Sequence, residues 1–155
     1  MNITLSRTAF AAALGVGIVT ALWASAEETR VAFPELDALI HYTTVNRGDV
    51  TEHMLTTQAA IDAVQAGQPI PDGTQVVLVD YREDEVYRYF VMEKGADWGA
   101  DYDEDRRTGD WQFQFYWGDR SINMEEDTAR CQSCHQSRVE SEYMYTYNDL
   151  RRFEQ

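Results

Sequence analysis

The sequence contains a single lysine, Lys94, and only two cysteines, Cys131 and Cys134. Basic residues are also few: 13 stand against 27 acidic residues, so the formal net charge is −14. Such a surface repels nucleic acids and anionic membranes, which excludes nucleic-acid binding as a function. The acidic charge favours solubility, or a partner protein that is basic or neutral.

Repeats and low-complexity segments are also missing, and the sequence has no EF-hand calcium loop. The acidic segment at residues 95–109 lacks the glycine and glutamate that this loop requires at its sixth and twelfth positions. Hydrophobic residues make up 44% of the chain, which is enough for a core and argues against disorder. The length of 155 residues fits one domain, which we place at residues 27–155.

The two cysteines belong to the motif Cys131-Gln132-Ser133-Cys134-His135, which has the spacing of a c-type haem attachment site. In a helix, residues three and four apart share a face, so both thiols can add to the vinyl groups along one porphyrin edge. The adjacent His135 can then bind the iron as its proximal ligand. The motif therefore predicts one covalently attached haem c.

Other interpretations of the cysteine spacing stay open. A Cys-x-x-Cys pair also occurs in thioredoxin-like redox proteins, and two cysteines can form a plain disulfide. Thioredoxin-type pairs begin a helix after an early strand, whereas this pair lies late in the chain, with no parallel-strand pattern before it. A zinc site would need two more soft ligands, for which only His41 and His53 remain.

The first 26 residues have the pattern of a secretory signal peptide. A short, weakly basic segment ends at Arg7, an apolar run covers residues 9–22, and Ala24-Ser25-Ala26 is a small-x-small cleavage pattern. We expect cleavage after Ala26 and a periplasmic location, where bacteria attach haem covalently. Because residues 9–26 are just long enough to cross a bilayer, an uncleaved membrane anchor is the alternative.

The remaining sequence predicts an α+β domain: an antiparallel sheet with flanking helices, and the haem between the sheet and the Cys-x-x-Cys-His helix. Thr57 is a suitable N-cap, and Gly67 a suitable C′ residue, for a helix between them. We expect helices at residues 35–41, 58–66 and 128–140 with a final helical turn up to residue 153, strands at residues 52–56, 74–81, 86–93 and 111–117, and a short extended piece at 143–147.

Residues 111–117 alternate strongly, with four large aromatic side chains on one strand face. Such a face can form the wall of a haem pocket, or it can simply fill the core. The candidates for the distal side of the haem, opposite His135, are Phe90, Met92, Phe113, Phe115, Arg88 and His53.

Each candidate type would act differently. Aromatic side chains exclude water and favour neutral ligands, whereas Met92 as a sixth ligand would indicate electron transfer. Arg88 could pair with a haem propionate or with a bound ligand, and it could equally be a solvent-exposed edge residue. His53 could donate a hydrogen bond on the distal side, or lie at the surface.

Several short motifs, taken together and in their order along the chain, resemble the cytochrome P460 family, which includes the cytochromes c′-beta. They span about 115 residues, and the haem motif is the most specific of them. The motifs are Phe33-Pro34, Pro71-Asp72-Gly73-Thr74, Met92-Glu93-Lys94, Gly109-Asp110-Trp111-Gln112-Phe113, residues 131–136, and Tyr143-Met144-Tyr145-Thr146.

The resemblance implies a periplasmic and often dimeric protein, with a c-type haem, a proximal histidine (here His135) and a distal side free to bind NO. Some members oxidise hydroxylamine or NO and have a lysine cross-linked to the haem, whereas others lack this link and bind NO. Where the catalytic members are expected to have that lysine, this chain has Gln65-Ala66-Gly67, and Lys94 instead follows a strand.

We therefore expect a c-type haem protein with an open distal iron site that binds or oxidises a small ligand such as NO or hydroxylamine. Whether it is an enzyme stays open, and no catalytic residue is assigned. One alternative is an electron-transfer cytochrome with a Met or His sixth ligand, whose acidic surface docks a basic redox partner. The other is a non-haem thiol–disulfide protein.

Overall fold

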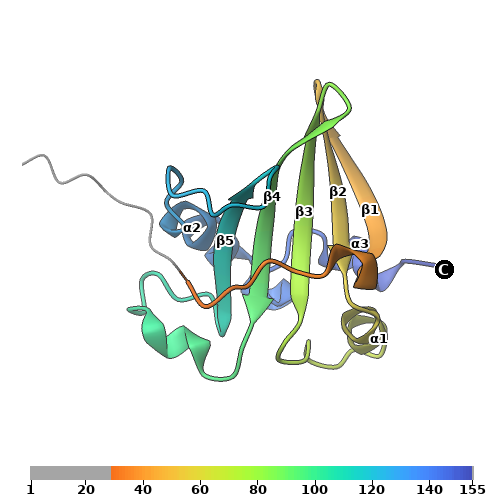
Figure 1. Cartoon of the computed structure of the whole chain (residues 1–155). Helices are drawn as coiled ribbons and strands as arrows, with labels where there is room; N and C mark the ends of the chain where they lie inside the picture. Colours follow the sequence, from red (N-terminus) through yellow and green to blue (C-terminus); the bar gives the residue numbers. More distant parts are fainter. Residues whose placement is uncertain (1–28, 155) are drawn as a thin grey trace, which may run out of the picture.

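A five-stranded antiparallel sheet forms the centre of the computed structural model, which describes residues 29–154 (Figure 1). The order of the strands in the sheet is the same as their order in the chain, so each strand pairs with the next. Helices flank the sheet, as the predicted α+β fold requires. The strands are β1 (Ile40–Arg47), β2 (Val50–Thr56), β3 (Gln75–Arg82), β4 (Glu85–Lys94) and β5 (Trp111–Trp117).

Short turns join the first four strands into two hairpins. Gly48, with a φ of 62°, allows the tight connection between β1 and β2. Glu83 and Asp84 connect β3 to β4, and both have positive φ angles, 51° and 64°. Two consecutive left-handed residues match the twist of the flanking strands, which explains the predicted hairpin at this position.

Helix α1 (Gln58–Gln65) connects β2 to β3, and its ends confirm the prediction. The Thr57 side chain accepts a hydrogen bond from the Ala60 amide at 3.2 Å, as an N-cap does. Gly67 follows the helix with a φ of 66°, the left-handed conformation typical of a C′ residue. Ile61 and Val64 are buried and attach the helix to the core.

The segment that precedes β1 covers one face of the sheet (Figure 1, orange). The Tyr116 hydroxyl donates a hydrogen bond of 2.7 Å to the Val31 carbonyl. The Phe33 ring contacts Tyr89 and Tyr116 edge to face, with ring centroids 5.0 and 5.1 Å apart. This segment therefore replaces a helical layer on this face, and it includes only the short 3-10 helix η1 (Leu36–Ala38).

The opposite face of the sheet packs against the C-terminal part of the chain, from residue 129 onward (Figure 1, blue). This part contains α2 (Ala129–His135), the 3-10 helix η3 (Gln136–Ser141) and α3 (Tyr147–Arg151). The core on this side includes Trp111 and Phe113 from β5, whereas Tyr116 of the same strand packs on the other side. The alternation expected for residues 111–117 is therefore confirmed.

Three local predictions differ from the structure. The helix expected at residues 35–41 is limited to η1, because Ile40 already pairs with Thr56 in the sheet. The helix expected at 128–140 ends at His135 and continues as η3, in which Arg138 leaves helical geometry (φ −114°, ψ 24°). The extended piece expected at residues 143–147 is absent: Tyr143 adopts a left-handed φ of 61°, and α3 begins at Tyr147.

Within residues 29–154, no helix has the length and hydrophobicity that a membrane span requires. The predicted signal peptide, residues 1–26, lies outside the described residues. Between β4 and β5 the acidic loop contains a further 3-10 helix, η2 (Trp98–Asp101).

Candidate functional site

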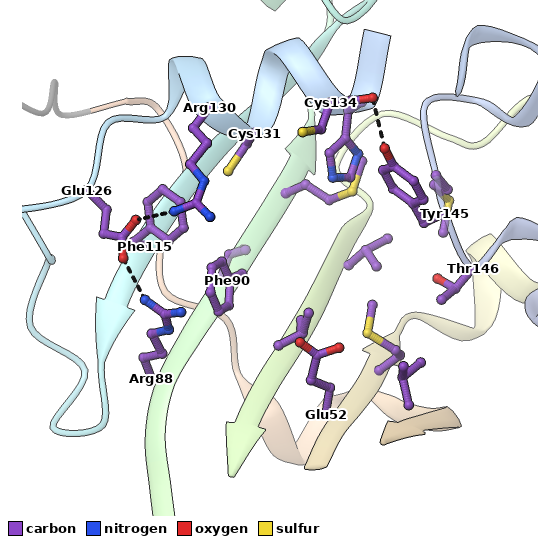
Figure 2. Close-up of a pocket in the computed structure, with 18 of the residues that line it drawn as sticks. Glu52, Arg88, Phe90, Phe115, Glu126, Arg130, Cys131, Cys134, Tyr145 and Thr146 are labelled. Carbon is purple, nitrogen blue, oxygen red and sulfur yellow. Dashed lines mark hydrogen bonds and ion pairs between the residues drawn. The ribbon is translucent and has the colours of Figure 1, made fainter. Parts of the chain in front are cut away.

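A pocket of about 500 Å³ lies between α2 and the sheet (Figure 2). All five strands contribute to its wall, together with α2 and the segment that follows η3. Figure 2 shows Cys131 and Cys134 on one side of the pocket and Glu52 on the other. Its size lies in the range of cofactor sites. Its apolar lining includes Val45, Met54, Val76, Leu78, Phe90 and Phe115.

Both cysteines line this pocket from α2, and both thiols are free. Cys131 packs against the core, whereas Cys134 is exposed. Burial raises the pKa of the Cys131 thiol to about 12, and the negative charge of Glu126 adds to this rise. A thioredoxin-like pair needs a thiol with a lowered pKa, so this environment argues against the thiol–disulfide interpretation.

His135, the last residue of α2, is held in a fixed orientation at the pocket. Its Nδ1 lies 2.6 Å from the Tyr143 carbonyl oxygen. Because a carbonyl oxygen only accepts hydrogen bonds, Nδ1 carries the proton and Nε2 keeps its lone pair. The imidazole packs against Phe113 and Tyr145, with ring centroids at 4.9 and 5.2 Å. This is the arrangement of a metal-binding histidine oriented by a backbone carbonyl.

The charge state of His135 agrees with this role. Burial lowers the pKa of the imidazole, the Tyr143 carbonyl partly opposes this effect, and the positive charge of Arg138 lowers the pKa further. The ring is therefore neutral at neutral pH, which is the form that binds a metal. Tyr145 also stabilises the motif, because its hydroxyl donates a hydrogen bond of 3.1 Å to the Cys134 carbonyl.

The carbonyl that orients His135 belongs to an unusual backbone segment. Glu142 and Tyr143 are both left-handed, with φ angles of 50° and 61°. Lys94, at the end of β4, holds this segment: its Nζ lies 3.1 Å from the Glu142 carboxylate and 2.8 Å from the Ile70 carbonyl. Lys94 does not line the pocket, so the chain's single lysine supports the histidine segment from outside.

Four of the residues predicted for the distal side line the pocket: Arg88, Phe90, Met92 and Phe115. The register of β4 and β5 places Phe90 opposite Phe115, and their rings meet edge to face at 4.9 Å. The Arg88 guanidinium lies 4.5 Å from the centre of the Phe90 ring. The sheet therefore brings these candidates together.

Phe113 and His53 occupy other positions. Phe113 is buried beneath the His135 ring and supports the imidazole, but it does not line the pocket. The distal position predicted for His53 is corrected by the structure. His53 contacts His41 and Tyr81, with ring centroids at 4.6 and 4.7 Å, and is not part of the pocket lining. Strand alternation places its ring on the opposite face of β2 from the pocket residues Glu52 and Met54.

Sequence reasoning missed several pocket residues. Glu52 precedes His53 on β2, and the period of two along a strand would have identified it once β2 was known to face the haem motif. Glu126, Tyr145 and Thr146 lie in loops beside α2 and α3, and no sequence pattern predicts that they reach the pocket.

A chain of ion pairs crosses the edge of the pocket (Figure 2). Arg88 Nε lies 3.0 Å from an Asp80 carboxylate oxygen, and Arg88 Nη1 lies 2.6 Å from Glu126 Oε1. The other Glu126 oxygen is 3.6 Å from Arg130, which precedes the first cysteine. The chain links β3 and β4 to α2, and it places two guanidinium groups where the carboxylates of a bound cofactor can reach them.

These features fit a haem. The two thiols are three residues apart on one helix, the imidazole beside them keeps a free Nε2, and an apolar cavity adjoins all three groups. Cavity walls of aromatic and aliphatic side chains suit the porphyrin faces, and arginines at the edge suit its propionates.

Comparison with known proteins agrees with the chemistry of the pocket. A search of curated proteins finds no significant match to this chain. The family model described as Cytochrome P460 matches residues 36–146, a range that includes all five strands, α2 and every pocket residue named above. The chain therefore belongs to the cytochrome P460 family, a family of haem-binding proteins.

Proposed function

We propose that this protein is a periplasmic c-type cytochrome that binds a small nitrogen-oxide ligand, such as NO, at a haem iron with an open distal position. Cys131 and Cys134 form the two thioether links, and His135 Nε2 is the proximal ligand. The observation that carries the proposal is the orientation of His135 by the Tyr143 carbonyl at 2.6 Å, beside a pocket of about 500 Å³.

The lining of the pocket supports binding of an external small ligand at the iron. Haem held by Cys131, Cys134 and His135 would supply an iron that can bind a small molecule. Among the described residues, His135 is the only histidine that lines the pocket, and no lysine lines it. Phe90 and Phe115 contribute apolar rings, which exclude water and favour a neutral ligand.

Oxidation of hydroxylamine by a lysine-linked haem is not supported. Lys94 is bound to Glu142 and to the Ile70 carbonyl, and it lies outside the pocket lining. The proposed activity is therefore reversible ligand binding, with oxidation of NO as its catalytic extension.

The test uses the full chain produced with bacterial haem-attachment factors. We expect a haem-dependent peroxidase stain on a denaturing gel, and a ferrous absorption spectrum that changes on addition of NO or CO. Replacing Cys131 with Ala should weaken covalent attachment. The matched control is Ser133→Ala in the same motif, where the exposed hydroxyl only contacts the Arg130 carbonyl and attachment should persist. A ferrous spectrum unchanged by both ligands would contradict an open distal position.

One observation favours a second candidate, an electron-transfer cytochrome. Three thioether side chains, those of Met54, Met92 and Met144, line the pocket, and any of them would fill the sixth position if it reached the iron. Separate Met→Leu variants distinguish the two functions. Conversion of a low-spin ferrous spectrum to one that binds CO in a single variant would establish methionine ligation. The acidic surface would then dock a basic redox protein, and docking would weaken as salt rises.

A further inference from the structure

Glu52 is a carboxylate in the wall of the candidate haem pocket. It lies in the middle of β2, where its register partners are Val45 on β1 and Asp80 on β3. Only 8% of its surface is exposed, yet its side chain lines the pocket, on the side opposite the cysteines (Figure 2). An acidic residue at this depth in a sheet needs a partner or a function.

The negative charge of the Glu52 carboxylate is only weakly balanced by cations and hydrogen-bond donors. Arg47 Nε lies 3.1 Å from Glu52 Oε2, but the Arg47 side chain is 69% exposed, and an exposed ion pair is weak. Oε2 itself is buried and receives no hydrogen bond from any described residue. Two neighbouring carboxylates differ: Asp80, the register partner of Glu52 on β3, and Glu126, which lines the pocket, both contact Arg88 at 3.0 Å or less.

The charges that face Glu52 come from every side of the pocket. They are Arg47 on β1, Asp80 on β3, Arg88 on β4, and Glu126, Arg130 and His135 across the cavity. Burial raises the pKa of Glu52 above its ordinary value of 4.5; Arg47 lowers it, Asp80 raises it and Arg88 lowers it. A haem in the cavity would displace water from the exposed part of the carboxyl group. This would strengthen the effect of burial, which is the largest of these effects and raises the pKa of Glu52.

We propose that Glu52 takes up a proton from solvent when the haem iron of this pocket is reduced, and releases it on oxidation. The inference rests on the proposed function, since it requires the haem. In the forward step, a one-electron reductant (a redox partner protein, or an electrode in the test) converts ferric to ferrous iron. A proton then passes from a hydronium ion of the solvent to a Glu52 carboxylate oxygen: one O–H bond forms at the carboxyl group, and one O–H bond of the hydronium breaks to leave water.

The physical reason is a change of charge inside a space of low dielectric constant. Ferric iron in a porphyrin carries one positive charge more than ferrous iron, and this charge stabilises a nearby carboxylate. Reduction removes the charge, so the carboxylate becomes more basic, while Arg47, its direct cationic partner among the described residues, remains largely in solvent. Asp80 and Glu126, in contrast, each have Arg88 as a direct cationic partner, at 3.0 and 2.6 Å.

The test is the midpoint potential of the haem-loaded full chain, measured from about pH 4 to about pH 9. We expect the midpoint potential to fall as the pH rises. The fall should occur in a pH range that begins above 4.5, the ordinary pKa of this carboxyl group. The slope approaches about 59 mV per pH unit, which is a tenfold change in proton concentration converted for one electron. The Glu52→Gln variant keeps the side-chain shape and should lose this slope.

Two further variants make the result specific. Glu126→Gln removes a carboxyl from the same pocket, and the slope should remain, because Glu126 is compensated by Arg88. Arg47→Gln removes the positive partner of Glu52, which makes the carboxyl more basic in both redox states and should move this pH range to higher values. Infrared difference spectra provide an independent readout: reduction should produce the band of a protonated carboxyl group in the wild type and not in Glu52→Gln.

A wild-type potential without this slope, or an equal slope in Glu52→Gln, would overturn the role of Glu52 and leave the proposed ligand binding intact. A sloping potential in a protein whose ferrous spectrum ignores NO and CO would support Glu52 and overturn the open distal position. A purified protein without covalent haem would overturn both.

Discussion

The charge compensation of Asp80 leads to a quantitative prediction for Arg88→Met. Asp80 is buried in β3, with only 3% of its side chain exposed, and it contacts Arg88 Nε at 3.0 Å. Removing one partner of a buried ion pair generally costs about 3–5 kcal/mol, because the remaining charge is buried without compensation. Arg82 still contacts Asp80 at 3.3 Å, and its side chain is 43% exposed, so it replaces part of the loss. We therefore expect a destabilisation somewhat below this range, about 2–3 kcal/mol.

Urea unfolding of the haem-loaded protein measures this effect. The matched control is Arg82→Met, which removes the more exposed partner of the same carboxylate and should cost less than about 1 kcal/mol. In the double variant Asp80→Asn with Arg88→Met, the buried charge is gone, and at least half of the lost stability should return. Equal unfolding midpoints for wild type and Arg88→Met would refute the reasoning, as would a larger effect of Arg82→Met.

Three further predictions concern the parts of the fold that hold the pocket together. Thr57→Ala removes the N-cap of α1 and should cost about 1 kcal/mol in denaturant unfolding; a change below about 0.3 kcal/mol would contradict the capping role. Leu150→Ala empties a fully buried position in α3 and should cost about 2–5 kcal/mol, whereas Val139→Ala at an exposed site in η3 should change stability by less than about 0.5 kcal/mol. Burial raises the pKa of the Tyr42 phenol, whose oxygen lies 2.6 Å from Thr146 Oγ1. Because the unfolded chain loses this proton near pH 10 and the folded chain keeps it, stability should fall above about pH 10, by up to about 1.4 kcal/mol per pH unit. Unfolding measured against pH should show a smaller fall for Tyr42→Phe, and identical profiles would exclude this phenol as the cause.

Local sequence patterns predicted the elements whose formation depends on neighbouring residues. The alternation of residues 111–117, the charged turn between β3 and β4, and the Thr57 and Gly67 ends of α1 all occur as expected. Each pattern reflects a local preference, either of the backbone for a turn or helix end, or of one strand face for apolar side chains. Such a preference does not depend on the rest of the fold. The Cys-x-x-Cys-His motif could be identified in the same way, because haem attachment and ligation depend on the spacing of these three residues along one helix.

Contacts between distant segments could not be predicted in this way. The helix expected at residues 35–41 is shorter in the structure, because Ile40 pairs with Thr56 of β2. This strand pairing outweighs a weak local preference for helix. The hydrogen bond from His135 to the Tyr143 carbonyl depends on two left-handed residues, Glu142 and Tyr143, neither of which is a glycine. No sequence signal marks such positions, since the conformation is stabilised by packing around it.

The sequence alone determined the β3–β4 hairpin, the strand β5, the helix between β2 and β3, and the residues with the chemistry to attach and ligate a haem. Only the tertiary structure decided which side chains meet that haem motif. In the structure, Glu52 lines the pocket, whereas its neighbour in the chain, His53, lies on the opposite face of the sheet. The reason is that a strand sends alternate side chains to opposite faces, and only packing against α2 selects which face becomes the pocket.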